Sequence, residues 1–223
     1  MLLDIFQSGM PFHMMLIYIV ITLTALVFTL VIHELCHGLA AYALGDPTAR
    51  RDGRLSLNPL RHIEPFGALM MLLVGFGWAR PVSVNPRFFD NPKRDMALTA
   101  LAGPISNFLL AFLSVGVMKL FDVTSIITNT VGSYIGDFFF YMAILSTGLG
   151  IFNLIPIPPL DGSKVLAAFL PDRLYWRYMQ IERYGMFILM GLLLLDRYIS
   201  VFGFIGAIRG SILSVFMNIF GIS

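Results

Sequence analysis

Charged residues are scarce in this sequence. Only 13% of its 223 residues are Asp, Glu, Lys or Arg, whereas 57% are hydrophobic. Soluble domains contain about 25% charged residues, so the composition argues against a soluble protein and predicts an integral membrane protein. The mean hydropathy of +0.81 agrees. Because the chain is short and has no polar linker, we expect a single domain over residues 1–223.

Cysteine and net charge are also low. The single cysteine, Cys36, excludes an intrachain disulfide. The formal net charge of +2 is too small to favour nucleic-acid binding. The partner that the composition predicts is the lipid bilayer.

Long apolar runs occupy most of the chain. A transmembrane helix needs about 20 apolar residues, with a range of about 17–25. Four runs are long enough, at about Met14–Leu44, Met96–Phe121, Tyr134–Leu154 and Met179–Leu195. The first is too long for a simple crossing, so we expect it to be tilted or to protrude from the membrane. Residues 198–223 form a fifth span or an interfacial segment, because Arg209 lies in the middle of this run. The sequence therefore predicts an all-α, multi-pass membrane protein with about five transmembrane helices.

Two neighbouring segments do not fit simple spans. Residues 66–78 are apolar but too few to cross a bilayer, which predicts a re-entrant or interfacial segment. The sequence ARPVSVNPRFFDNPKRD, residues 79–95, contains three prolines and favours an extended loop or edge strand over a helix. We therefore expect a re-entrant or extended membrane-associated segment around residues 66–88.

Basic residues are distributed unevenly between the two ends of the predicted spans. If the spans alternate in direction, one side receives 12 of the 15 Lys and Arg residues. These are Arg50, Arg51, Arg54, Arg61, Arg80, Arg87, Lys93, Arg94, Lys164, Arg173, Arg177 and Arg183. The positive-inside rule makes this side cytosolic, so we expect an integral protein of the cytoplasmic (inner) cell membrane.

The first span contains the pattern HELCHG, residues 33–38. On a helix, His33 and His37 lie on one face and can bind a single metal ion, while Glu34 lies beside it and can hold a water molecule. Ionisable groups inside a membrane are usually functional, although a polar cluster between helices is the alternative. His33 precedes Leu44 by roughly 16 Å of helix, which places the site in the cytosolic half of the membrane.

A catalytic zinc ion needs a third protein ligand. His13 begins the span at its opposite end and His62 lies in a basic loop, so Asp161 is the better candidate. Asp161 stands in NLIPIPPLDG, where the prolines prevent a continuous helix. A helix after it would cover about 12 Å back to the cytosolic face, which matches the depth of His33. The alternative is an ordinary turn residue or helix cap.

Three motifs resemble those of the site-2 protease family of intramembrane zinc metallopeptidases. They are HELCHG, LAGPISN (residues 101–107) and NLIPIPPLDG (residues 153–162), in this order and each on its own span. The loops GRLSLNPLRHIEPFG and GWARPVSVNP are similar to those of its short bacterial and archaeal branch.

The resemblance implies a role for each residue of the site. His33, His37 and Asp161 would bind one zinc ion, Glu34 would be the catalytic base, and Asn107 would line the site and position the substrate or transition state. Glu34 would assist attack of zinc-bound water and pass the proton to the leaving nitrogen. The reaction implied is hydrolysis of peptide bonds within or near transmembrane helices of membrane-protein substrates, as in regulated intramembrane proteolysis.

A helical substrate must unwind before its peptide bond can be attacked. The extended sequence RPVSVNP, residues 80–86, could offer a sheet edge for the unwound strand, and a packed loop is the alternative. Cys36 is adjacent to His37, but a free cysteine usually packs as a small hydrophobic residue. Asn107 could instead bond within a helix start.

Other functions fit the residues less well. A metallopeptidase with a downstream Glu as third ligand would have only Glu64 and Glu182, both in basic, loop-like sequence. A metal-binding transporter also places His and Asp at helix breaks near the midplane, but it has no use for Glu34. A non-catalytic pseudoprotease would be expected to lack one of the four key residues, and all four are present. We therefore expect a zinc metalloendopeptidase.

Overall fold

The computed structural model describes residues 9–62, 64, 80–123 and 130–222, and the regular elements in these ranges are all helical. In chain order they are α2 (Phe12–Ala43), α3 (Thr48–Arg51), η1 (Pro59–Arg61), η2 (Pro86–Phe88), α5 (Pro92–Val123), α6 (Thr130–Asn153), α7 (Asp161–Phe169), α8 (Asp172–Ile199) and α9 (Gly203–Ile219). The helices α2, α5, α6 and α8 are long and apolar enough to cross a membrane, and α9 is shorter. The predicted all-α, multi-pass membrane fold is confirmed.

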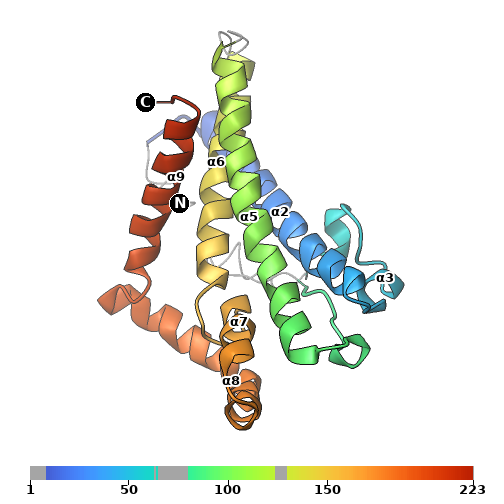
Figure 1. The fold of residues 1–223 in the computed structure, drawn as a ribbon. Helices are drawn as coiled ribbons and strands as arrows, with labels where there is room; N and C mark the ends of the chain where they lie inside the picture. Colours follow the sequence, from blue (N-terminus) through green and yellow to red (C-terminus); the bar gives the residue numbers. More distant parts are fainter. Residues whose placement is uncertain (1–8, 63, 65–79, 124–129, 223) are drawn as a thin grey trace.

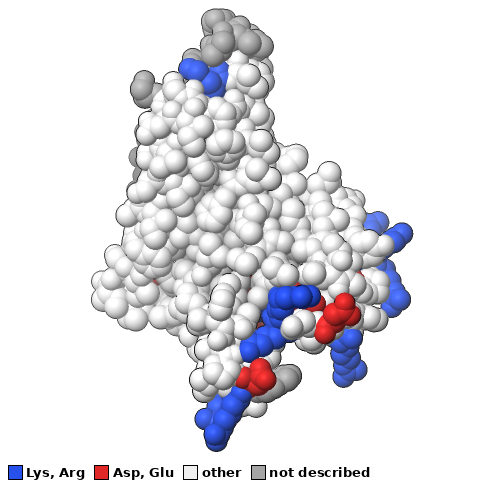
Figure 2. All heavy atoms as spheres, viewed as in Figure 1, with Lys and Arg blue, Asp and Glu red and all other residues white. Residues whose placement is uncertain are grey.

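The helices pack around α5 and α6, which run side by side with α2 against both (Figure 1). The short helix α7 packs against the lower half of α5, and α9 packs along α6. Helix α8 runs across the lower end of this bundle and contacts α7. The space-filling view shows most visible Lys and Arg side chains at the same lower end (Figure 2).

Helix α2 presents a stripe of small and polar residues to its neighbours. The buried positions recur every three or four residues, as one face of a helix requires. They include Thr22, Ala25, Thr29, His33, His37 and Ala41. Small residues at such contacts let membrane helices approach closely, and Thr29 also shares a hydrogen bond of 2.9 Å with Ser146 of α6. The stripe therefore directs both histidines into the bundle.

Helix α5 begins at Pro92. The prediction of a loop over residues 79–95 is therefore wrong for its last four residues, 92–95, which are helical. The first turn is capped from both sides: Asn91 Oδ1 accepts from the Arg94 N–H at 3.2 Å, and Asp95 Oδ2 accepts from the Asn91 N–H at 3.0 Å. Proline is tolerated in a first turn, where its missing N–H has no helical partner to lose. Earlier in the predicted loop, residues 80–85 have no regular structure. The predicted re-entrant segment at residues 66–78 lies outside the described residues.

The proline-rich connection between α6 and α7 is the helix break that the sequence predicts. Helix α6 ends at Asn153, three residues before Pro156, and α7 begins at Asp161. A Cβ atom at Gly162 would lie 2.1 Å from the Leu154 carbonyl oxygen, so only glycine allows this close approach of backbone. The break thus places Asp161 at the start of a helix beside α5.

Candidate active site

His33 and His37 face each other on α2. Their Nε2 atoms are 3.0 Å apart, and the two side chains belong to residues that are only 4% and 8% exposed. The four-residue spacing therefore has the effect that the sequence predicts, with two imidazoles on one buried helix face.

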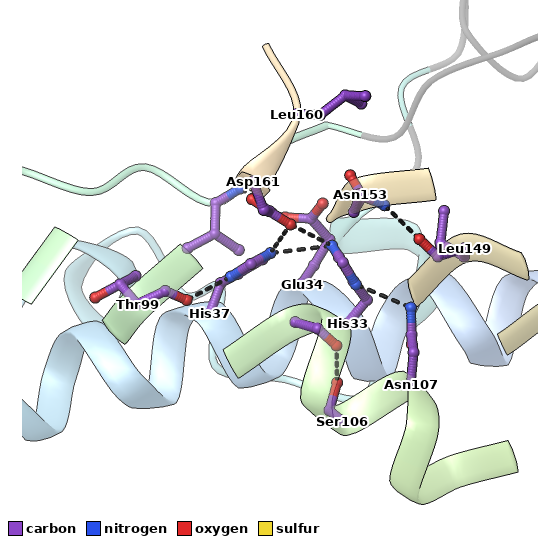
Figure 3. Close-up of polar contacts among 12 residues, drawn as sticks. His33, Glu34, His37, Thr99, Ser106, Asn107, Leu149, Asn153, Leu160 and Asp161 are labelled. Carbon is purple, nitrogen blue, oxygen red and sulfur yellow. Dashed lines mark hydrogen bonds and ion pairs between the residues drawn. The ribbon is translucent and has the colours of Figure 1, made fainter. Parts of the chain in front are cut away.

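Asp161 completes the group from the start of α7. Its Oδ2 atom lies 3.2 Å from His33 Nε2 and 3.1 Å from His37 Nε2 (Figure 3). Residues separated by more than a hundred positions thus bring three potential ligand atoms together, and all three residues are buried. Within the described part of the chain, this group contains none of the alternatives His13, His62 or Cys36.

The three atoms fit a zinc ion. Bonds of about 2.0 Å in a tetrahedral site separate neighbouring ligands by about 3.3 Å, close to the observed edges of 3.0–3.2 Å. The buried Asp161 Oδ2 makes no well-aligned hydrogen bond to a described residue, which a carboxylate oxygen rarely tolerates without another partner. Two imidazoles and a carboxylate leave the fourth position of a tetrahedral zinc site open.

Helix α5 holds the outer sides of both imidazoles. His37 Nδ1 lies 2.7 Å from the Thr99 carbonyl oxygen, and His33 Nδ1 lies 3.0 Å from Asn107 Nδ2 (Figure 3). Hydrogen bonds of this kind fix the orientation of metal-binding histidines. Asn107 therefore meets the site from behind His33, and it is not among the residues that line the cavity described below.

Gly103 lets α5 pass directly against the two rings. A Cβ atom here would lie 2.3 Å from His37 Nε2 and 2.7 Å from His33 Cε1, much closer than carbon and nitrogen atoms can approach. From the motif LAGPISN we predicted a role for Asn107 and none for Gly103. The sequence feature that could have indicated Gly103 is the glycine itself. Glycine destabilises the interior of a helix, so its presence there often indicates close packing.

Glu34 is held by the segment from Arg80 to Pro86. The Val82 N–H donates a hydrogen bond of 2.9 Å to Glu34 Oε2. The same segment is fixed on either side, because the Arg80 N–H donates to the His62 carbonyl oxygen and the Asn85 N–H donates to Asp46 Oδ2, at 2.8 and 2.7 Å. The sequence RPVSVNP therefore lies across the site.

A cavity of about 420 Å³ opens onto the metal-binding group. Its walls come from α2, the 80–86 segment, α5, the end of α6, the α6–α7 connection, α7 and α8. The lining residues are His33, Glu34, His37, Pro81, Val82, Val84, Pro86, Met96, Thr99, Ala100, Asn153, Pro159, Asp161, Lys164, Met179 and Glu182. The predicted base and the three predicted ligands thus share one cavity.

Two lining residues differ from the sequence-based expectation. Asn153 contributes the amide in the cavity wall, whereas the sequence predicts Asn107 in this position. Glu182, rejected as a ligand because its sequence looked loop-like, lies on helix α8 and lines the cavity outside the metal-binding group. Asn153 is the first residue of NLIPIPPLDG, and this motif is the signal that could have identified it. Glu182 belongs to no motif, and only the folded chain brings it to the cavity.

The fold and the site together define a class, a multi-pass membrane protein whose HExxH histidines and Asp161 form a buried group that could bind a metal ion. Comparison with known proteins narrows this class. The family model of peptidase family M50 matches residues 21–195. The chain belongs to peptidase family M50, the site-2 proteases, and is a zinc metalloprotease.

Individual relatives agree with this assignment. YwhC of Bacillus subtilis, which carries the provisional name of a zinc metalloprotease, is 38% identical over 91% of this chain and 92% of its own. MJ0611 of Methanocaldococcus jannaschii, with the same provisional name, is 30% identical over 72% of this chain and 76% of its own. Rip2 of Mycobacterium tuberculosis H37Rv, also so named, is 30% identical over 64% of this chain and 54% of its own. No solved structure gives a significant match.

Proposed function

We propose that this protein is an intramembrane endopeptidase that hydrolyses peptide bonds within or next to transmembrane helices of membrane-protein substrates. In this proposal His33, His37 and Asp161 hold one zinc ion and Glu34 is the catalytic base. The observation that carries the proposal is the buried triangle of ligand atoms, 3.0–3.2 Å on each edge, in a cavity that Glu34 also lines.

The chemistry divides between the ion and Glu34. Zinc held by the three ligands would polarise the substrate carbonyl and lower the pKa of the attacking water. Glu34 would take the water's proton and deliver it to the leaving nitrogen as the peptide bond breaks. Because the Val82 N–H occupies Oε2, we assign the proton to Glu34 Oε1. The hydrogen bond would hold the carboxylate in place through both transfers.

The 80–86 segment is our proposed guide for the unwound substrate. Val82 and Val84 both line the cavity, and the Val84 N–H makes no hydrogen bond to another described residue. An extended peptide could therefore pair with this edge beside the metal-binding group. Photo-crosslinkers at positions 82 and 84 should capture a transmembrane substrate trapped on the Glu34→Gln variant. Failure of both positions to crosslink would remove the edge from the mechanism.

Position in the membrane follows from charge. Of the 15 Lys and Arg residues, 12 lie in α3, in the connection from α3 to α5, at the start of α5, in α7 and in the first half of α8. Figure 2 shows most of the visible basic side chains at this lower end of the bundle. By the positive-inside rule we propose that the cavity lies in the cytosolic half of the cytoplasmic membrane.

The test begins without a substrate. Purified wild-type protein should contain one zinc ion per chain by elemental mass spectrometry, and Asp161→Asn should lose most of it, because an amide is a poor zinc ligand. Zinc retention by Asp161→Asn would exclude Asp161 as a ligand. Absence of zinc from the wild type would favour a metal transporter or a pseudoprotease.

A further inference from the structure

The side chain of Asn107 is fully buried and faces a metal ligand. The residue is 0% exposed, its Nδ2 lies 3.0 Å from His33 Nδ1, and its Oδ1 makes no hydrogen bond to a described residue. It does not line the cavity. Asn107 therefore reaches His33 from outside the cavity.

A hydrogen bond from Asn107 Nδ2 to His33 Nδ1 corresponds to one form of the His33 ring. An amide nitrogen can only donate, so His33 Nδ1 accepts and a neutral ring carries its proton on Nε2. This Nε2 proton then faces the lone pair of His37 Nε2, 3.0 Å away. With its proton on Nε2, the His33 ring has no lone pair on this atom for a metal ion, so this form is the metal-free one.

Metal binding through Nε2 requires the other form. The lone pair must be on Nε2 and the proton on Nδ1, and a buried Nδ1–H needs an acceptor. The Oδ1 of Asn107 becomes that acceptor if the amide turns by half a revolution about its Cβ–Cγ bond. Oxygen and nitrogen of the amide then exchange places without moving the helix.

His37 shows the contrast. Its Nδ1 lies 2.7 Å from the Thr99 carbonyl oxygen, which can only accept. A neutral His37 ring is therefore already in the form whose Nε2 lone pair is free for a metal. Of the two imidazoles, only His33 faces a group that can donate in one orientation and accept in the other.

We propose that Asn107 is a positioning residue for His33, with an amide that donates through Nδ2 to the metal-free ring and accepts through Oδ1 from the metal-loaded ring. This inference rests on the metal site proposed above. Asp at this position would only accept, and Leu, of similar size, would do neither, so the two substitutions separate hydrogen bonding from packing.

Co²⁺ provides a probe that does not depend on cleavage. Its affinity for the full-length, detergent-solubilised protein can be measured by chelator competition and by the visible absorption of the bound ion. Asn107→Leu should weaken Co²⁺ binding by about 10–100-fold, the usual effect of removing the partner of a metal-binding histidine. Asn107→Asp should bind Co²⁺ at least as tightly as the wild type. Ser106→Ala is the matched control, because the Ser106 hydroxyl donates within α5, to the Gly103 carbonyl oxygen at 2.7 Å.

The outcomes distinguish this inference from the metal site itself. Wild-type Co²⁺ affinity in Asn107→Leu, or equal losses in the Leu and Asp variants, would overturn the role of Asn107. Failure of the wild type to bind Co²⁺, or full binding by Asp161→Asn, would instead overturn the proposed ligands.

A measurement on the wild-type protein tests the proposal even if the variants do not fold. The chain has 4 histidines, so ¹⁵N-histidine NMR can resolve each ring. Zinc-loaded protein should carry the His33 proton on Nδ1, and metal-free protein should carry it on Nε2. Finding the same protonated nitrogen in both states would refute the turn of the amide.

Discussion

The two sides of the cavity at the candidate active site are built differently. On one side, the metal-binding group comes from long or closely packed helices, and its three residues are buried. On the other side, the 80–86 segment has no regular structure before η2, and α8 contributes the partly exposed Met179 and Glu182. We call the first side the cradle (α2, α5 and α7) and the second side the cover (residues 80–86 and α8).

The difference follows from what each side must do. A metal site needs ligand atoms at fixed separations, which packed helices provide because their side chains are held by neighbours. A peptide bond must reach the same site, so the other wall must contact a substrate of varying sequence. Backbone groups suit this task because every peptide offers the same N–H and C=O partners. Four predictions test the comparison, from the largest expected effect to the smallest.

Gly103→Ala should disrupt the arrangement of His33, His37 and Asp161 in the cradle. The added methyl group would lie 2.3 Å from His37 Nε2, so the rings or α5 must move away. We expect zinc content to fall towards zero and cleavage to fall to background. Gly210→Ala in α9 is the matched control, because a Cβ atom there meets nothing within 4 Å. Wild-type zinc content in Gly103→Ala would show that the predicted ligands still bind the ion after α5 or the imidazole rings have moved.

Glu34→Gln should separate chemistry from metal binding. The amide keeps the shape of the side chain and can still accept from the Val82 N–H, but it cannot take a proton. Cleavage should fall by about 10²–10⁴-fold, the usual contribution of general acid–base catalysis. Zinc per chain should stay at the wild-type value. Near wild-type cleavage would remove Glu34 from the mechanism.

Val82→Pro should disturb the cover and leave the cradle intact. Proline lacks the N–H that binds Glu34 Oε2. A hydrogen bond to a charged group contributes about 1.5–3 kcal/mol, so we expect kcat to fall by at least about tenfold with zinc content unchanged. Val82→Ala retains the N–H and should have a smaller effect in the same kinetic assay. Equal losses in both variants would assign the effect to the valine side chain.

Cys36→Ala should have the smallest effect. Cys36 is partly buried on α2 and lies outside the metal-binding group of the described residues. Zinc content and cleavage should both match the wild type. A marked drop in zinc affinity would mean that the thiol approaches the ion.

Local periodicity accounts for the parts of the site that the sequence predicted. Four-residue spacing places His33 and His37 together on any helix, and the prolines of NLIPIPPLDG interrupt any helix. Helix α2 begins two residues before its predicted start, α6 four residues before and α8 seven residues before. Helix α5 begins four residues before its predicted start. There, side-chain caps from Asn91 and Asp95 extend the helix back to Pro92.

Contacts between distant segments were not predictable in the same way. The Val82–Glu34 and Asn107–His33 hydrogen bonds join residues 48 and 74 positions apart. Neither pair has a spacing that a helix or turn dictates. Asn107 was expected to line the site, and the structure places it behind His33. The rotation of α5 relative to α2 decides which face of α5 meets His33.

The sequence by itself determined a multi-pass helical membrane protein, a histidine pair on one helix face with a glutamate beside it, and an aspartate at a helix break. These features depend on bonds and spacings within single segments. Only the tertiary structure decided which atoms meet: Asp161 with the two imidazoles, Asn107 with His33, and Val82 with Glu34. Those contacts depend on how closely and at what rotation separate helices pack, and small residues such as Gly103 set that approach only once the whole bundle has formed.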